Sequence, residues 1–159
     1  ELENFERQAM YKNSMIFVTN KQDSEIDMLD DIIHEVAHLV EETREKLIYE
    51  DGTLEKEFLE KRNSLYKIMS KAGFTKDYSF FINPKYNIEF DFFLHRDVGY
   101  DKLRNYTTGL FYSPYGSTSL SEYFANGFEA FFMRDGIGRL KRISPTLFQK
   151  LVDLTGELP

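Results

Sequence analysis

The chain has 159 residues, of which 42% are hydrophobic and 30% charged, the composition of an ordinary folded domain with room for a buried core. Its formal net charge of −7 argues against nucleic acid and anionic membranes as partners, whereas a basic peptide is compatible with this charge. Because there is no cysteine, the chain forms no disulfide, and any metal ion must be bound by nitrogen and oxygen atoms.

A single domain is predicted over residues 1–159, because this length suits one folded unit and no repeat or linker divides the sequence. The sequence begins with Glu1 rather than Met, so we expect a domain that was processed or excised from a longer chain. No apolar run reaches the ~18 residues that a membrane-spanning helix requires.

The first third of the chain predicts one strand and one long helix. Residues 1–12 are mostly polar, which favours a short helix or an irregular lead-in, and the apolar run 14–20 predicts a buried strand. Ser24 is a good N-cap for a helix that continues to Tyr49 and ends at Gly52. The residues at helical spacing that are expected to face the core are Ile26, Leu29, Ile33, Val36, Ala37 and Val40.

The central third predicts a helix followed by an aromatic-rich segment. Thr53 is expected to cap a helix over Leu54–Ala72. Residues 74–112 contain many aromatic side chains and alternate with a period of two at Ile88–Phe92, which favours short strands and ordered loop. They are expected either to wall a substrate cleft or to form a second small core. His95 lies among them, and a structural or substrate-facing role is favoured over that of a metal ligand.

The last third is predicted to be helical. A turn-rich loop at 113–119 leads into a helix over Leu120–Arg134. Ser144 followed by Pro145 predicts the start of a final helix that ends near Leu154. Together these elements predict an α+β fold that is mostly helical with a small sheet.

The pattern H-E-V-A-H at residues 34–38 is the strongest chemical signal in the sequence. His34 and His38 are four residues apart, so both imidazoles leave one face of the helix a turn apart and can bind one zinc ion. Glu35 is placed to act as general base toward a water on that ion. The alternative is a solvated helix with two histidines, but a chance H-E-x-x-H in a chain with three histidines is on the order of one in a hundred or rarer.

A catalytic zinc ion needs a third protein ligand and an open position. Residues 39–52 contain no histidine, which excludes the class of site whose third ligand is a histidine shortly after the motif. A carboxylate from a later helix is the other solution. Glu122 is the leading candidate, although it also completes a capping box that begins at Ser119. Asn126 and Glu129 follow on the same helical face, where they are candidates for orienting the histidine rings.

The stretch Y-G-S-T-S-L-S-E-Y-F-A-N-G-F at residues 115–128 resembles a signature of the anthrax lethal factor catalytic domain, which the clostridial Pro-Pro endopeptidases share in a looser form. In that family a tyrosine lies seven residues before the glutamate ligand, and Tyr115 and Glu122 keep this interval. Arg139-Leu140 followed by Pro145-x-x-Phe148 is similar to the end of the family's sequences. The resemblance covers most of the chain outside residues 53–112.

The resemblance implies that His34, His38 and Glu122 bind one Zn²⁺ ion per chain. It implies Glu35 as base and proton shuttle, and Tyr115 as the phenol that hydrogen-bonds the oxyanion of the reaction intermediate. It further implies a zincin of the glutamate-ligand type, a zinc endopeptidase that acts on a protein or peptide. A toxin or another secreted or delivered effector is the context that this family favours.

The chain departs from the family in ways that limit what carries over. Ala37 stands where the family often has Gly, and Asn126 stands where lethal-factor-like members have a second acidic residue. The aromatic-rich segment is longer, so substrate specificity does not carry over. Charge and composition favour a basic or proline-containing peptide as substrate. The alternative from another functional class is an inactive lethal-factor-like module that docks a partner protein.

Overall fold

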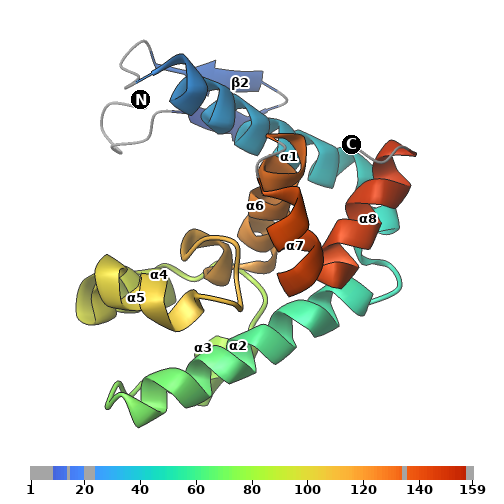
Figure 1. The fold of residues 1–159 in the computed structure, drawn as a ribbon. Helices are drawn as coiled ribbons and strands as arrows, with labels where there is room; N and C mark the ends of the chain where they lie inside the picture. Colours follow the sequence, from blue (N-terminus) through green and yellow to red (C-terminus); the bar gives the residue numbers. More distant parts are fainter. Residues whose placement is uncertain (1–8, 14, 20–23, 134–135, 157–159) are drawn as a thin grey trace.

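The computed structural model is mostly helical, with one small two-stranded sheet at one end (Figure 1). Helix α6 (Leu120–Phe132) packs most extensively against helix α1 (Glu25–Tyr49) and lies between α1 and α2 (Thr53–Lys71) in the view of Figure 1. The prediction of a mostly helical chain with a small sheet is therefore confirmed. The structure describes residues 9–13, 15–19, 24–133 and 136–156.

The sheet is a hairpin that lies against α1. Strand β1 (Ala9–Lys12) pairs antiparallel with β2 (Met15–Val18), with Ala9 opposite Val18. A strand is confirmed at the described residues of 14–20, but the prediction that it is buried is wrong, because Met15 and Phe17 are 54% and 40% exposed. The helix or lead-in predicted over 1–12 is wrong at residues 9–12. This short strand is defined by its pairing with β2 and by its contact with α1, neither of which is encoded in its own hydrophobic pattern.

Helix α1 has the bounds that its capping residues predict. The Ser24 side chain accepts a hydrogen bond from the backbone N–H of Asp27 at 3.1 Å, and Gly52 beyond the end adopts a φ of +68°. The expected core face is correct from Ile33 onward. It is wrong for Ile26 and Leu29, which are exposed, because the apolar periodicity extends past the part of α1 that packs on the core.

The C-terminal helices cover α6. Helices α7 (Ile137–Ile143) and α8 (Pro145–Thr155) both pack on it, and Gly127 of α6 meets α8 so closely that a Cβ there would lie 2.2 Å from Leu147 Cδ2. The sequence analysis predicts no separate helix at residues 137–143, where α7 lies. Helix α6 ends at Phe132 in place of Arg134, which lies outside the described residues. The predicted final helix is confirmed.

The N-terminus of α8 is capped from another helix. The Ser144 side chain makes no capping hydrogen bond to α8. Glu57 of α2 accepts hydrogen bonds from the backbone N–H groups of Thr146 and Leu147 at 2.8 and 3.2 Å. The helix predicted at Leu54–Ala72 is confirmed to within one residue at each end, although its N-cap is Gly52 rather than Thr53.

The strands predicted within 74–112 are wrong, because this segment is a chain of short helices. Its helices are α3 (Tyr78–Ile82), α4 (Ile88–Phe92), the π-helical turn η2 (Phe93–Gly99) and α5 (Tyr100–Thr107). Phe90 is buried, but Ile88 and Phe92 are 60% and 45% exposed, so the alternating residues share no buried face. The Asn87 side chain instead caps α4 by accepting from Phe90 N–H. The buried aromatic residues of the segment join the main core.

Candidate metal centre

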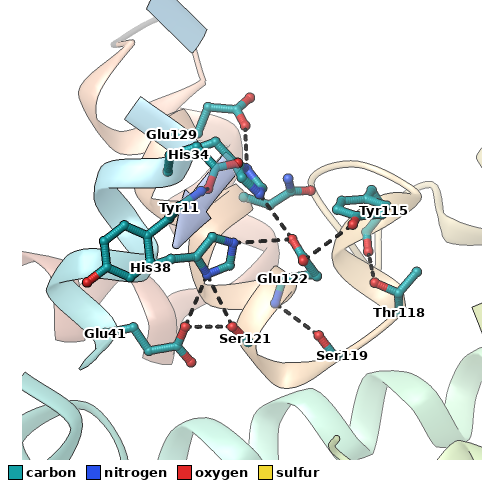
Figure 2. A network of polar contacts seen from close by, with 12 residues as sticks. Tyr11, His34, His38, Glu41, Tyr115, Thr118, Ser119, Ser121, Glu122 and Glu129 are labelled. Carbon is teal, nitrogen blue, oxygen red and sulfur yellow. Dashed lines mark hydrogen bonds and ion pairs between the residues drawn. The ribbon is translucent and has the colours of Figure 1, made fainter. Parts of the chain in front are cut away.

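Helices α1 and α6 bring two histidines and a glutamate together at their interface (Figure 2). Glu122 Oε2 lies 3.0 Å from His34 Nε2 and 3.8 Å from His38 Nε2. Two ligands of a tetrahedral ion with bonds of about 2.0–2.1 Å are roughly 3.3–3.4 Å apart. The two distances lie on either side of this value, and all three ligand atoms lie within 4.8 Å of one another, so the cluster can hold a metal ion.

Glu122 lies in the first turn of α6, which the side chain of Ser119 caps. Its backbone N–H donates to Ser119 Oγ at 3.1 Å, which fixes the start of α6. Its carboxylate points to the histidines and not back to Ser119 (Figure 2). Ser119 therefore caps α6 as the sequence predicts, whereas the Glu122 side chain faces the histidines instead of completing the capping box.

Two carboxylates flank the His34 ring. Nε2 faces Glu122, and Nδ1 lies 3.4 Å from Glu129 Oε2. Burial alone would lower the pKa of His34, but hydrogen bonds and charge from Glu122 and Glu129 outweigh it and raise the pKa to about 10. A proton and a metal ion therefore compete for this ring.

His38 is oriented by a carboxylate that the sequence reasoning missed. Its Nδ1 lies 3.3 Å from Glu41 Oε2, the oxygen that also accepts the hydroxyl of Ser121 at 2.5 Å. The other Glu41 oxygen accepts the phenol of Tyr49 at 2.6 Å. Burial raises the pKa of Glu41, but these hydrogen bonds lower it further than burial raises it. The sequence spacing could have indicated this contact, because Glu41 follows His38 by three residues on the same helical face.

The histidines and Glu122 open onto a cleft of about 500 Å³ that also contains the predicted catalytic residues. Glu35 accepts the backbone N–H of Tyr11, in strand β1, at 2.5 Å. The phenol of Tyr115 donates to Glu122 Oε1 at 3.3 Å. The residues that line the cleft are Ala9, Met10, Tyr11, Asp30, Asp31, His34, Glu35, His38, Tyr115, Glu122, Asn126 and Glu129.

Asn126 contacts the loop that carries Tyr115 and makes no described hydrogen bond to a histidine. Its Oδ1 accepts the hydroxyl of Ser113, and a Cβ at Gly116 would lie 3.0 Å from the same oxygen. Of the two residues predicted to orient the histidines, Glu129 is therefore the one with a described hydrogen bond to a histidine.

His95 lies beside Tyr115 and outside the group of metal-capable side chains found among the described residues. The two ring centroids are 6.3 Å apart, and the Tyr115 centroid is also 6.3 Å from that of His34. His95 Nε2 lies 3.0 Å from Asp91 Oδ1, one turn earlier. It belongs to the π-helical turn, a conformation that often occurs at functional sites.

No protein-family model, curated protein or solved structure matches the chain. The resemblance to the lethal factor catalytic domain therefore stays a prediction, and function must be argued from the site itself. Among the residues that the structure describes, none of the helices combines the length and apolarity needed to cross a membrane.

Proposed function

We propose that the chain is a zinc-dependent endopeptidase. The observation that carries the proposal is the convergence of His34 and His38 with Glu122, which is 88 residues from His34 in sequence, beside an open cleft. Three protein ligands of the His₂Glu type, without cysteine, are characteristic of catalytic zinc sites, whose fourth position is open to water or substrate.

The remaining residues of the cleft supply the acid–base and hydrogen-bonding groups. Zinc, when bound, polarises the scissile carbonyl and lowers the pKa of water toward ~7. Glu35 is the carboxylate that takes a proton from the attacking water and returns it to the leaving amine. Tyr115 donates its phenolic hydrogen to the oxyanion of the tetrahedral intermediate, a contribution of about 3–4 kcal/mol for a single well-aimed donor.

The charge of the cleft favours a basic peptide as substrate. Among the residues that the structure describes, the lining contains no lysine or arginine. It contains five carboxylates, those of Asp30, Asp31, Glu35, Glu122 and Glu129. Strand β1 borders the cleft through Ala9–Tyr11, so an extended peptide can lie along it. A peptide with Lys or Arg near the scissile bond is therefore attracted to this site more strongly than an acidic one.

The proposal is tested by measuring zinc content and peptide cleavage on one preparation. We expect one zinc ion per chain by elemental analysis and cleavage of a mixed-sequence peptide library, read by mass spectrometry, with basic residues enriched near the cut. Chelation should stop cleavage, and stoichiometric zinc should restore it. A chain that binds no zinc would contradict the proposal, and one that binds zinc but cleaves no peptide or protein would favour a docking module.

Glu41 gives a separate prediction about zinc affinity. The Glu41→Gln substitution replaces one acceptor oxygen of a carboxylate that His38, Ser121 and Tyr49 share, so the His38 ring loses its orientation. We expect zinc affinity to fall roughly 10–100-fold, measured by competition with a chromophoric chelator. Glu45→Gln, one turn further along α1 and exposed, is the matched control and should bind zinc as the wild type does. Equal affinities in the two variants would exclude this role.

A further inference from the structure

A buried arginine on α2 binds the loop that carries Tyr115. Arg62 is 1% exposed, and its Nη1 donates to the backbone carbonyls of Ser117 and Thr118 at 2.5 and 3.1 Å. Its Nη2 donates to the carbonyls of Phe80 and Asn83 at 2.5 and 3.4 Å. The guanidinium therefore connects the loop that carries Tyr115 to helix α3 and its C-cap residue, Asn83.

The burial of this charge is energetically costly. No carboxylate pairs with Arg62 within the part of the chain that the structure describes, and its compensation comes from carbonyl dipoles and from the ring of Phe90, 4.1 Å away. Burial lowers the pKa of Arg62 to about 9, so it still carries its charge near neutral pH. A hydrophobic residue would fill the same space at lower cost, but it could not bind carbonyls from two segments.

Two of the carbonyls that Arg62 binds belong to Ser117 and Thr118, which follow Tyr115 closely in sequence. Residues Tyr115–Ser117 form a single 3₁₀ turn, in which both the backbone N–H and the hydroxyl of Thr118 donate to the Tyr115 carbonyl, at 3.0 and 2.7 Å. Arg62 therefore binds the carbonyls of a turn whose next residue, Ser119, caps α6, the helix that carries Glu122. Fixing these two carbonyls fixes the backbone from which the Tyr115 side chain projects toward Glu122.

We propose that Arg62 is a positioning residue for Tyr115, which it holds in register with Glu122 through the carbonyls of Ser117 and Thr118. This inference rests on the proposed function, because it assigns Tyr115 a role in the reaction. Lysine cannot replace arginine here, since an ammonium group lacks the planar fork that reaches two segments at once. Arg62 itself does not line the cleft, so it acts through Tyr115 and not on the substrate.

The first test is a double-mutant cycle with Arg62→Lys and Tyr115→Phe. Tyr115→Phe should lower kcat about 10²–10³-fold, the usual effect of losing one oxyanion donor. We expect Arg62→Lys alone to lower kcat about tenfold or more with little change in KM, and to have less than a roughly twofold effect in the Tyr115→Phe background. Losses that simply add would overturn the proposal, because Arg62 would then act independently of the phenol.

A second test does not depend on activity. Hydrogen exchange at the amides of Ser117 and Thr118, which are bonded within the turn, should be faster in Arg62→Lys than in the wild type. The matched control is Lys61→Gln, which removes the neighbouring buried cation. Lys61 binds the carbonyls of Leu110 and Ile143, outside the Tyr115 turn. This control should lose global stability without a selective change in those two amides.

The two tests separate failure of the inference from failure of the proposed function. If the wild type hydrolyses no peptide, the proposed function fails, and amide exchange alone decides whether Arg62 holds the loop. If the wild type is active but exchange in Arg62→Lys matches the Lys61→Gln control, the inference about Arg62 is wrong while the endopeptidase assignment stands.

Discussion

Replacing Glu35 with Gln should abolish most peptide hydrolysis while leaving one zinc ion bound per chain. The amide keeps the size of the side chain and can still accept the backbone N–H of Tyr11, but it cannot take a proton from water. General-base catalysis typically contributes 10²–10⁴-fold, so we expect kcat/KM to fall by about that factor. The measurement compares cleavage of the best library peptide with zinc content in the same sample.

Glu42→Gln is the control for this experiment, because Glu42 also contacts strand β1. It accepts the phenol of Tyr11 at 2.5 Å but does not line the cleft. A loss of activity in Glu35→Gln that came only from loosening the hairpin would be matched in Glu42→Gln. We expect the control to keep wild-type activity within about a factor of three, as surface substitutions usually have small effects. Substantial hydrolysis by Glu35→Gln would exclude Glu35 as the base.

Removing the acid of Glu122 should have the largest effect on metal binding. Glu122→Gln preserves the backbone cap to Ser119, so α6 should form normally, but only two histidines remain as strong ligands. For the wild type, zinc at 100 times its dissociation constant adds about 2.7 kcal/mol of stability, which corresponds to an increase in Tm of roughly 5–11 °C in a domain of this size. We expect this increase to vanish in Glu122→Gln at the same zinc concentration, as measured by calorimetry.

The control is Glu129→Gln, on the same helix. Glu129 faces the opposite nitrogen of His34 and contacts no other predicted ligand, so its loss should weaken zinc binding much less. A Tm increase that persists in Glu122→Gln and disappears in Glu129→Gln would show that the third ligand has been assigned to the wrong glutamate.

The parts of the fold that the sequence predicts correctly are those with local signals. Ser24 and Ser119 cap their helices with their own side chains, and the helices that follow have long apolar periods. In α4, by contrast, Ile88–Phe92 is too short to separate a period of two from one turn of helix. Strand β1 exists through pairing with a partner, so its own residues do not specify it.

In the candidate site, too, local spacing predicts some residues and not others. The spacing of His34 and His38 predicts that they share a helical face, and Glu41 was within reach of the same argument. The role of Arg62 could not be predicted from spacing, because it depends on where carbonyls from two separate segments lie after folding. Its sequence context shows only a charged residue on an amphipathic helix, which normally indicates a solvated surface.

The long separation of the ligands in sequence has a consequence for synthesis of the protein. Glu122 follows His34 by 88 residues, so at about 5–20 residues per second roughly 4–18 s pass between translation of the first ligand and of the last. Until α6 has emerged from the ribosome and packed on α1, the two histidines lack Glu122 and the cleft lacks Tyr115. On the proposed function, a nascent chain therefore cannot hydrolyse itself or its neighbours, and activity begins only after α6 has packed on α1.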